Sequence, residues 1–164
     1  MRSGNFWIAS ALLWTAVLGA QTSAVGLNSL SAVVHVTAPE KVVARKNQLV
    51  TVDFVVEVKT GYHVNSNTPA DEYLIPLKLT FSEGAATLQE VVYPKPSMEK
   101  FEFSQKPVSV FQGGFKTQAK IKILPQTPAG STFLNGKLRY QACNDRMCLP
   151  PRTLDVKVPL EIRN

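Results

Sequence analysis

The feature that most constrains this chain is a regular alternation of apolar and polar residues. The segment 49–58, LVTVDFVVEV, carries an apolar residue at every second position from Val50 to Val58, with Asp53 and Glu57 among the residues between them. Successive side chains of a β-strand point to opposite faces of a sheet. This period of two therefore predicts a strand with one face in a core and the other in solvent.

The same alternation recurs in segments spread over most of the chain. The clearest are IPLKLTF (75–81), FKTQAKIKIL (115–124) and TLDVKVPLEI (153–162), with further candidates in AVVHVTA (32–38) and TLQEVVY (87–93). Eleven prolines and nine glycines punctuate the sequence, and none of these runs keeps a helical period. About seven to nine short antiparallel strands are expected, which predicts an all-β, immunoglobulin-like antiparallel β-sandwich. A closed barrel is the main alternative.

The first 24 residues have the order of a secretory signal peptide. MRSGN carries one positive charge, FWIASALLWTAVLGA is apolar, and QTSA supplies small residues. Cleavage is expected after Ala24, with Ala20 as the second choice, so that residues 25–164 form one exported, periplasmic domain. The alternative, a membrane anchor, is disfavoured because the run is short and no charged stop follows it.

The net charge of +6 comes from lysines and arginines that are spread along the chain. Without a basic patch, an exported protein is not expected to bind nucleic acid. No Ser/His/Asp order, paired carboxylates or phosphate-binding loop is visible. We therefore expect neither a cofactor nor a small-molecule substrate, and we expect the domain to act as a monomer.

The chain has only two cysteines, Cys143 and Cys148. Asn144 and Asp145 between them are turn formers, which predicts a hairpin loop with a cysteine at each shoulder. Two cysteines and two well-separated histidines do not supply the ligands of a zinc site, and outside the cytosol such a cysteine pair normally oxidises. Closing so short a loop stabilises a fold by only about 2 kcal/mol.

Two interpretations of the pair follow. It is a redox-active dithiol that exchanges with a partner's thiolate, or it is a local structural bridge in a redox-inert, immunoglobulin-like protein-binding module. The preceding run, GKLRYQAC, places Leu138, Tyr140 and Ala142 on the inward face. Cys143 then falls on the outward face with Gln141, which predicts an accessible sulfur.

The motif QACND..CLPP, preceded by GYHVNS and by a Tyr-Pro segment with an aromatic loop, resembles a known family. Over residues 33–162 the chain is similar to the N-terminal periplasmic domain of the thiol:disulfide interchange protein DsbD. That resemblance implies a disulfide-reductase relay that takes electrons from a membrane transporter. It passes them to thioredoxin-like periplasmic proteins, namely disulfide isomerases and cytochrome c maturation proteins. It also implies that Cys148 forms the mixed disulfide and that Cys143 resolves it.

The chain departs from that family in three respects. Its cysteine loop is one residue shorter than in the best-known members. It stops at Asn164 without a membrane domain or a C-terminal thioredoxin-like domain, so the electron donor is expected to be a separate membrane protein, the alternative being that the relay role has been lost. The aromatic pair that lines the family's site is replaced by His63 and Asn65, which share one face of a strand. His63 is expected to raise the thiolate fraction of a cysteine or to hold a proton, the alternative being an exposed residue at a strand edge. His35 is expected to be solvated.

The segment 93–107, YPKPSMEKFEFSQKP, is similar to the family's cap loop, whose aromatic side chain shields the disulfide. Phe103 is the best match and Phe101 the second; the alternative is that both rings are ordinary core residues. Glu102 is expected to influence a cysteine pKa. Two methionines, Met98 and Met147, raise the alternative of a Cu(I) site, but no metal site is expected.

Overall fold

The computed structural model describes residues 32–164, so the predicted signal peptide and its cleavage site lie outside the described residues. Within the described part of the chain every helix or strand is a β-strand, and there are twelve of them. No helix in that part is long and apolar enough to cross a membrane. The all-β prediction is confirmed.

The strands form three four-stranded sheets. The first contains, in spatial order, β1 (Val34–Thr37), β3 (Leu49–Val58), β9 (Gly114–Ile123) and β6 (Ala86–Val92). The second contains β2 (Val42–Arg45), β12 (Arg152–Arg163), β10 (Gly130–Tyr140) and β5 (Lys78–Phe81). The third contains β11 (Ala142–Cys143), β4 (His63–Asn65), β8 (Val108–Gln112) and β7 (Ser97–Glu99). All neighbours are antiparallel except β2 and β12.

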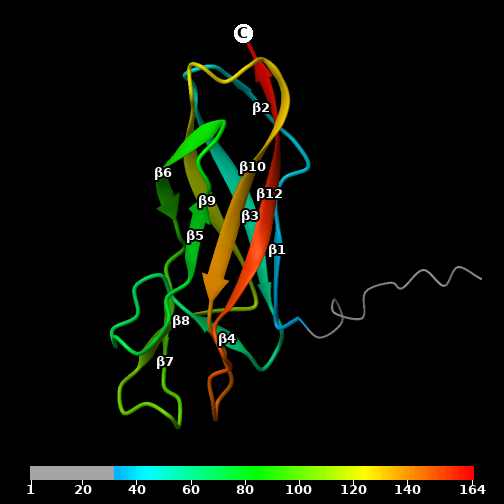
Figure 1. Cartoon of the computed structure of the whole chain (residues 1–164). Coiled ribbons are helices and arrows are strands. Elements are labelled where there is room, and N and C mark those ends of the chain that lie inside the picture. Colours follow the sequence, from blue (N-terminus) through cyan, green and yellow to red (C-terminus); the bar gives the residue numbers. More distant parts are fainter. Residues whose placement is uncertain (1–31) are drawn as a thin grey trace, which may run out of the picture. The chain divides into compact units, whose positions relative to one another are not determined.

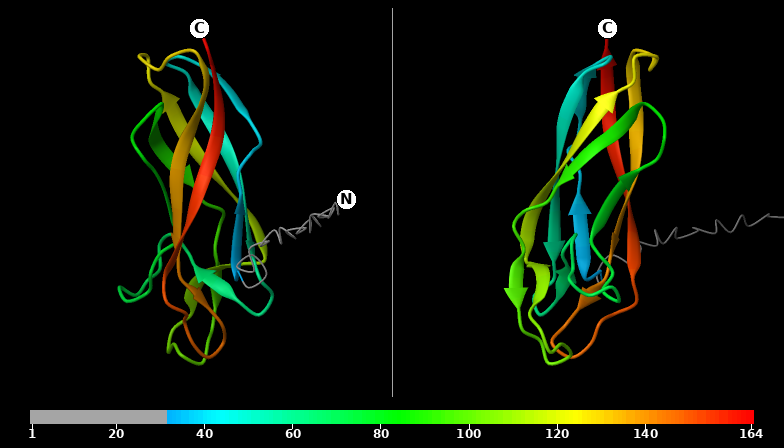
Figure 2. Two further views of the ribbon diagram at one scale, coloured as in Figure 1. Left: turned by 45° about the vertical axis from the view of Figure 1, so that its right-hand side comes forward. Right: turned by 90° about the vertical axis from the view of Figure 1, so that its left-hand side faces the viewer.

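The first two sheets form the body of a sandwich, and the third lies at the end opposite the C-terminus (Figure 1). The views in Figure 2 show the strands of the two larger sheets running along opposite sides of the domain. Both sheets are open rather than closed on themselves, so the immunoglobulin-like sandwich is confirmed over the barrel.

The predicted inward faces form one core between these sheets. Phe54 on β3, Ile121 on β9, Leu138 on β10 and Val158 on β12 are all fully buried, while the residues between them, such as Asp53, are exposed. Burial of such side chains stabilises a fold by about 1.5–3 kcal/mol each. The alternation in the sequence therefore identified the core face of each long strand.

The third sheet is covered on both faces, and this feature positions the candidate site. On one face Val64, Phe111 and Ala142 are cross-strand partners and belong to the main core. Its other face carries a second, smaller apolar group, which we call the end cluster. The end cluster consists of Leu74, Val108 and Val110 with the partly buried Phe101 and Phe103.

Candidate functional site

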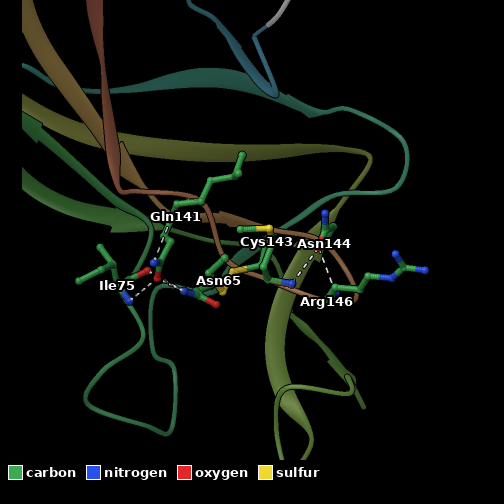
Figure 3. Close-up of a disulfide and its surroundings, with 9 residues drawn as sticks. Asn65, Ile75, Gln141, Cys143, Asn144 and Arg146 are labelled. Carbon is green, nitrogen blue, oxygen red and sulfur yellow. Dashed lines mark hydrogen bonds between the residues drawn. A yellow bond between two sulfur atoms is a disulfide. The ribbon is translucent and has the colours of Figure 1, made fainter.

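Cys143 and Cys148 form a disulfide across a tight hairpin, with their Cα atoms 3.9 Å apart. The side chain of Asn144 shapes this turn, because its Oδ1 accepts hydrogen bonds from the backbone N–H groups of Arg146 (3.0 Å) and Met147 (2.9 Å) (Figure 3). The Asn144 N–H also donates to the Met147 carbonyl oxygen at 2.9 Å. The predicted hairpin is confirmed, and its turn is held by hydrogen bonds as well as by the disulfide.

The expectation of an accessible Cys143 is wrong, since that residue is 0% exposed. The alternation did place it opposite Ala142, which belongs to the main core. The face to which Cys143 belongs is nevertheless not open to solvent, because the third sheet is covered there too. Cys148, on the other shoulder of the hairpin, is only partly buried. The two cysteines therefore differ in their exposure to solvent: Cys143 is buried and Cys148 is partly exposed.

His63 lies directly across from Cys143 in the third sheet, and Gln112 is its partner on the far side. Directly opposed residues of an antiparallel pair have Cβ atoms about 4.5–5.5 Å apart and point to the same face. His63 is 2% exposed, so the alternative of an exposed strand-edge residue is wrong. Its Nε2 atom is buried and has no hydrogen-bond partner.

Burial lowers the pKa of His63 below its usual value of 6.5, because an apolar environment disfavours the imidazolium. The carboxylates of Asp145 and Glu99 act in the opposite direction, but more weakly. The side chain is therefore neutral at pH 7, with a basic nitrogen enclosed in the protein.

The two phenylalanines of the 93–107 segment cover His63. The Phe101 ring is stacked on the imidazole at a centroid distance of 3.9 Å, and Phe103 follows at 6.2 Å from the imidazole. The two phenyl rings are themselves parallel, 5.3 Å apart. Phe101, the second choice from the sequence, is thus the nearer ring, and both rings pack in the end cluster rather than in the main core. Glu102 between them is exposed.

Asn65 anchors the segment between β4 and β5 to the cysteine hairpin. Its Nδ2 donates to the Ile75 carbonyl oxygen (3.0 Å) and to Gln141 Oε1 (3.3 Å), as Figure 3 shows. Gln141 Oε1 also accepts from the Ile75 N–H, and Gln141 Nε2 donates to the Leu149 carbonyl oxygen, both at 3.3 Å. This network holds residues on both sides of the disulfide.

The sequence reasoning did not identify Gln141 as part of the site. Its place on the face of Cys143 was visible from the alternation, but its partners are Asn65 on β4 and the backbone of Ile75 and Leu149 in two loops. His35 is exposed on β1, as predicted. Met98 and Met147 are 60% and 57% exposed, and in residues 32–164 no group of three or more His, Cys, Asp or Glu side chains is arranged to hold a metal.

Comparison with known protein families identifies a match. The profile of a protein family described as "Thiol:disulfide interchange protein DsbD, N-terminal" matches residues 33–160. The comparison with curated proteins found no match.

Two solved structures are similar to the chain. One is the N-terminal periplasmic domain of ScsB from Proteus mirabilis, at 16% identity and a TM-score of 0.49, covering 78% of this chain and 45% of that one. Another is a family 123 glycoside hydrolase from Clostridium perfringens, at 15% identity and a TM-score of 0.30, covering 81% of this chain and 27% of that one. The chain thus spans less than half of either structure. The family match, which extends over most of the chain, shows that this protein belongs to the family of DsbD N-terminal domains.

Proposed function

We propose that this domain is a periplasmic thiol–disulfide relay that passes reducing equivalents through the Cys143/Cys148 pair to partner proteins. The observation that carries the proposal is the unequal access of the two cysteines. Cys143 is fully buried and Cys148 is partly exposed. An exchange site needs one sulfur that a partner can reach and a second that only its neighbour can reach.

In the electron-accepting step, a partner thiolate attacks Cys148 Sγ. A bond forms between the partner sulfur and Cys148, the Cys143–Cys148 bond breaks, and its electron pair goes to Cys143 Sγ. A second thiol of the donor then attacks the donor sulfur of the mixed disulfide, which releases Cys148 as a thiolate and completes the reduction. When the reduced domain passes its electrons to an acceptor, Cys143 is the only thiol of the chain that can resolve the mixed disulfide on Cys148, because no other cysteine exists. These roles agree with those implied by the family resemblance.

The hairpin supports a pair that opens and closes without unfolding. Asn144 Oδ1 accepts hydrogen bonds from two backbone N–H groups of the turn, and the Leu149 N–H donates to the Ala142 carbonyl oxygen at 2.8 Å. These bonds fix the turn independently of the sulfur atoms. Breaking the disulfide therefore leaves the backbone of the turn paired. A bridge of this kind adds little stability, as expected for so short a loop.

The partners follow from family membership. We propose that the electron donor is a membrane electron transporter and that the acceptors are thioredoxin-like periplasmic proteins, including those that serve disulfide isomerisation and cytochrome c maturation. The reaction class is that of a protein-disulfide reductase. The periplasmic location and the signal peptide over residues 1–24 are part of the same proposal.

Trapping of mixed disulfides tests this function. The Cys143→Ser variant leaves Cys148 free and unresolved, so it should accumulate a mixed disulfide with a thioredoxin-like protein, visible on a non-reducing gel. The Cys148→Ser variant is the matched control and should trap much less, because the remaining sulfur is buried. Equal trapping would refute the assignment of roles, and no trapping by either variant would favour the redox-inert binding module.

A further inference from the structure

Two buried polar atoms of β4 lack a hydrogen-bond partner, His63 Nε2 and Asn65 Oδ1, although the great majority of buried polar atoms in proteins have one. Of these two residues, His63 is the one that lies directly across from Cys143. A phenylalanine at this position would stack on Phe101 equally well without leaving a nitrogen unpaired. The cost of keeping a histidine here points to a role in a state other than the disulfide form.

We propose that His63 Nε2 accepts the proton of the Cys143 thiol when the reduced domain resolves a mixed disulfide, an inference that rests on the function proposed above. The oxidised pair offers no proton to this nitrogen. Reduction converts Cys143 Sγ into an S–H donor on the residue directly opposite His63 in the sheet. The reduced state therefore supplies the partner that the imidazole lacks.

The geometry holds the imidazole in place for this transfer. Phe101 lies on its ring at 3.9 Å and only 14° from parallel, and the strand pairing of β4 with both β11 and β8 fixes its backbone. The site is closed to water on this face, since His63 and Cys143 are both almost fully buried. A buried thiol loses its proton reluctantly because burial disfavours the thiolate, and the imidazole of His63 supplies a base on the same enclosed face.

The chemical step balances without an external reagent. Cys148 thiolate first attacks a partner's disulfide, which forms a mixed disulfide and releases one partner thiolate. Cys143 Sγ then gives its proton to His63 Nε2 and attacks Cys148 Sγ. The Cys143–Cys148 bond forms, the bond between Cys148 and the partner breaks, and its electron pair leaves on the partner's second sulfur. The imidazolium returns its proton to that thiolate or to solvent, so the domain is oxidised by two electrons and the partner is reduced by two.

The charges around His63 determine the pH dependence. Burial favours the neutral imidazole, while Asp145 on the hairpin and Glu99 on β7 favour the imidazolium. The other charged residues on these two elements and the loop after β7 are Lys100, Glu102, Lys106 and Arg146, all exposed. The facing residue on β8 is the neutral Gln112. The pKa of His63 lies below 6.5, so the imidazole becomes protonated only when the pH falls below that value. The protonated imidazole can no longer accept the proton of the thiol.

The test follows the reduced protein reacting with dithiobis(nitrobenzoate), an aromatic disulfide that releases a coloured thiolate in each of two phases. The first phase is attack by Cys148 and depends on reagent concentration. The second is the intramolecular attack by Cys143 and does not. The variant His63→Phe keeps the stacked ring and removes the nitrogen, and His63→Gln removes the titration while keeping a polar group. His35→Gln, at the exposed histidine of β1, is the matched control.

In the wild-type protein the second-phase rate should be level at neutral pH and fall as the pH drops below 6.5. In His63→Phe it should be about 10²-fold slower at pH 7, the size of a typical general-base contribution, and should rise about tenfold per pH unit as direct ionisation of the thiol takes over. His35→Gln should behave as wild type. If His63→Phe fails to fold in thermal unfolding, His63→Gln carries the same expectation.

Two outcomes would overturn the proposal. The first refutes only the role of His63, and the second also refutes the relay function. A normal first phase with an unchanged second-phase rate and pH profile in the His63 variants would remove the role of His63 and leave the proposed relay intact. Absence of a first phase in the wild-type protein would remove the relay function and this inference with it.

Discussion

The imidazole of His63 and the phenyl ring of Phe101 are stacked with their centroids 3.9 Å apart and their planes inclined by 14°. The contact joins β4, where His63 faces Cys143, to the loop between β7 and β8. Access to the buried sulfur and the position of this loop are therefore linked through one pair of rings. A displacement of the loop would remove the ring that covers His63, the residue directly across from Cys143.

Removal of the nearer ring should open the site more than removal of the farther one. We expect Phe101→Ala to accelerate reaction of the reduced pair with a small disulfide reagent, and Phe103→Ala to do so less, because Phe103 lies 6.2 Å from the imidazole. Each half-buried ring should cost about 2 kcal/mol of stability, less than a fully buried phenylalanine. Thiol reactivity and urea unfolding measured on both variants decide this. A larger rate increase in Phe103→Ala would instead support the assignment of Phe103 as the cap.

Reduction of the disulfide should leave the fold intact. The loop that it closes is short, so the loss in free energy of unfolding should not exceed about 2–3 kcal/mol. Asn144 continues to hold the turn, because its Oδ1 accepts two backbone hydrogen bonds that do not involve sulfur. Circular dichroism and urea unfolding of the oxidised and reduced protein measure the difference. Global unfolding on mild reduction would show a structural bridge.

Replacement of Gln141 should weaken the attachment of the hairpin. Gln141→Ala removes the acceptor for Ile75 N and the donor to the Leu149 carbonyl, so we expect a loss of about 1–3 kcal/mol. Arg139→Ala, at an exposed position two residues earlier, near the end of β10, is the control and should change stability by about 0.5 kcal/mol or less. Chemical denaturation compares the two. Equal losses would mean that the network contributes nothing specific.

The folded protein should lose stability in mildly acidic solution because of His63. Its pKa is lower in the folded state than the usual 6.5 of an unfolded chain, with burial as the main cause. The unfolded state then binds more protons between the lowered pKa and 6.5, so stability falls as the pH decreases through that window. Urea unfolding at several pH values should show this slope in the wild-type protein and in His35→Gln. A slope of the same size in His63→Phe would contradict the assignment.

Much of this molecule could be predicted from local patterns. The alternation in 49–58 and 153–162 identified the buried faces of β3 and β12. The side chains of a strand point to only two faces, and the face with the apolar side chains is the one that packs in the core. The turn formers Asn144 and Asp145 located the hairpin. The QACND..CLPP motif and its surroundings pointed to the family that the match over residues 33–160 shows.

The environment of Cys143 could not be predicted in the same way. Its position in GKLRYQAC assigns it to the face opposite Ala142, and that assignment agrees with the structure. Whether that face is open or covered depends on residues elsewhere in the chain: Leu74 from one loop and Phe101 and Phe103 from another, which pack with Val108 and Val110 of the same sheet. The alternation of side chains along one strand carries no information about which other segments of the chain pack over that strand.

The pairing of His63 with Cys143 also combines a local property of the sequence with a property that depends on the tertiary structure. The alternation of side chains in GYHVN is a local property, and it placed His63 and Asn65 on one face before any tertiary contact was known. The register that sets His63 across from Cys143, 80 residues later in the sequence numbering, is decided by the packing of the whole sandwich. Local sequence therefore determined which side chains share a face, because backbone geometry alone sets that period. Only the tertiary structure decided which faces meet and which atoms are closed off from water, because burial is a sum over contacts from distant parts of the chain.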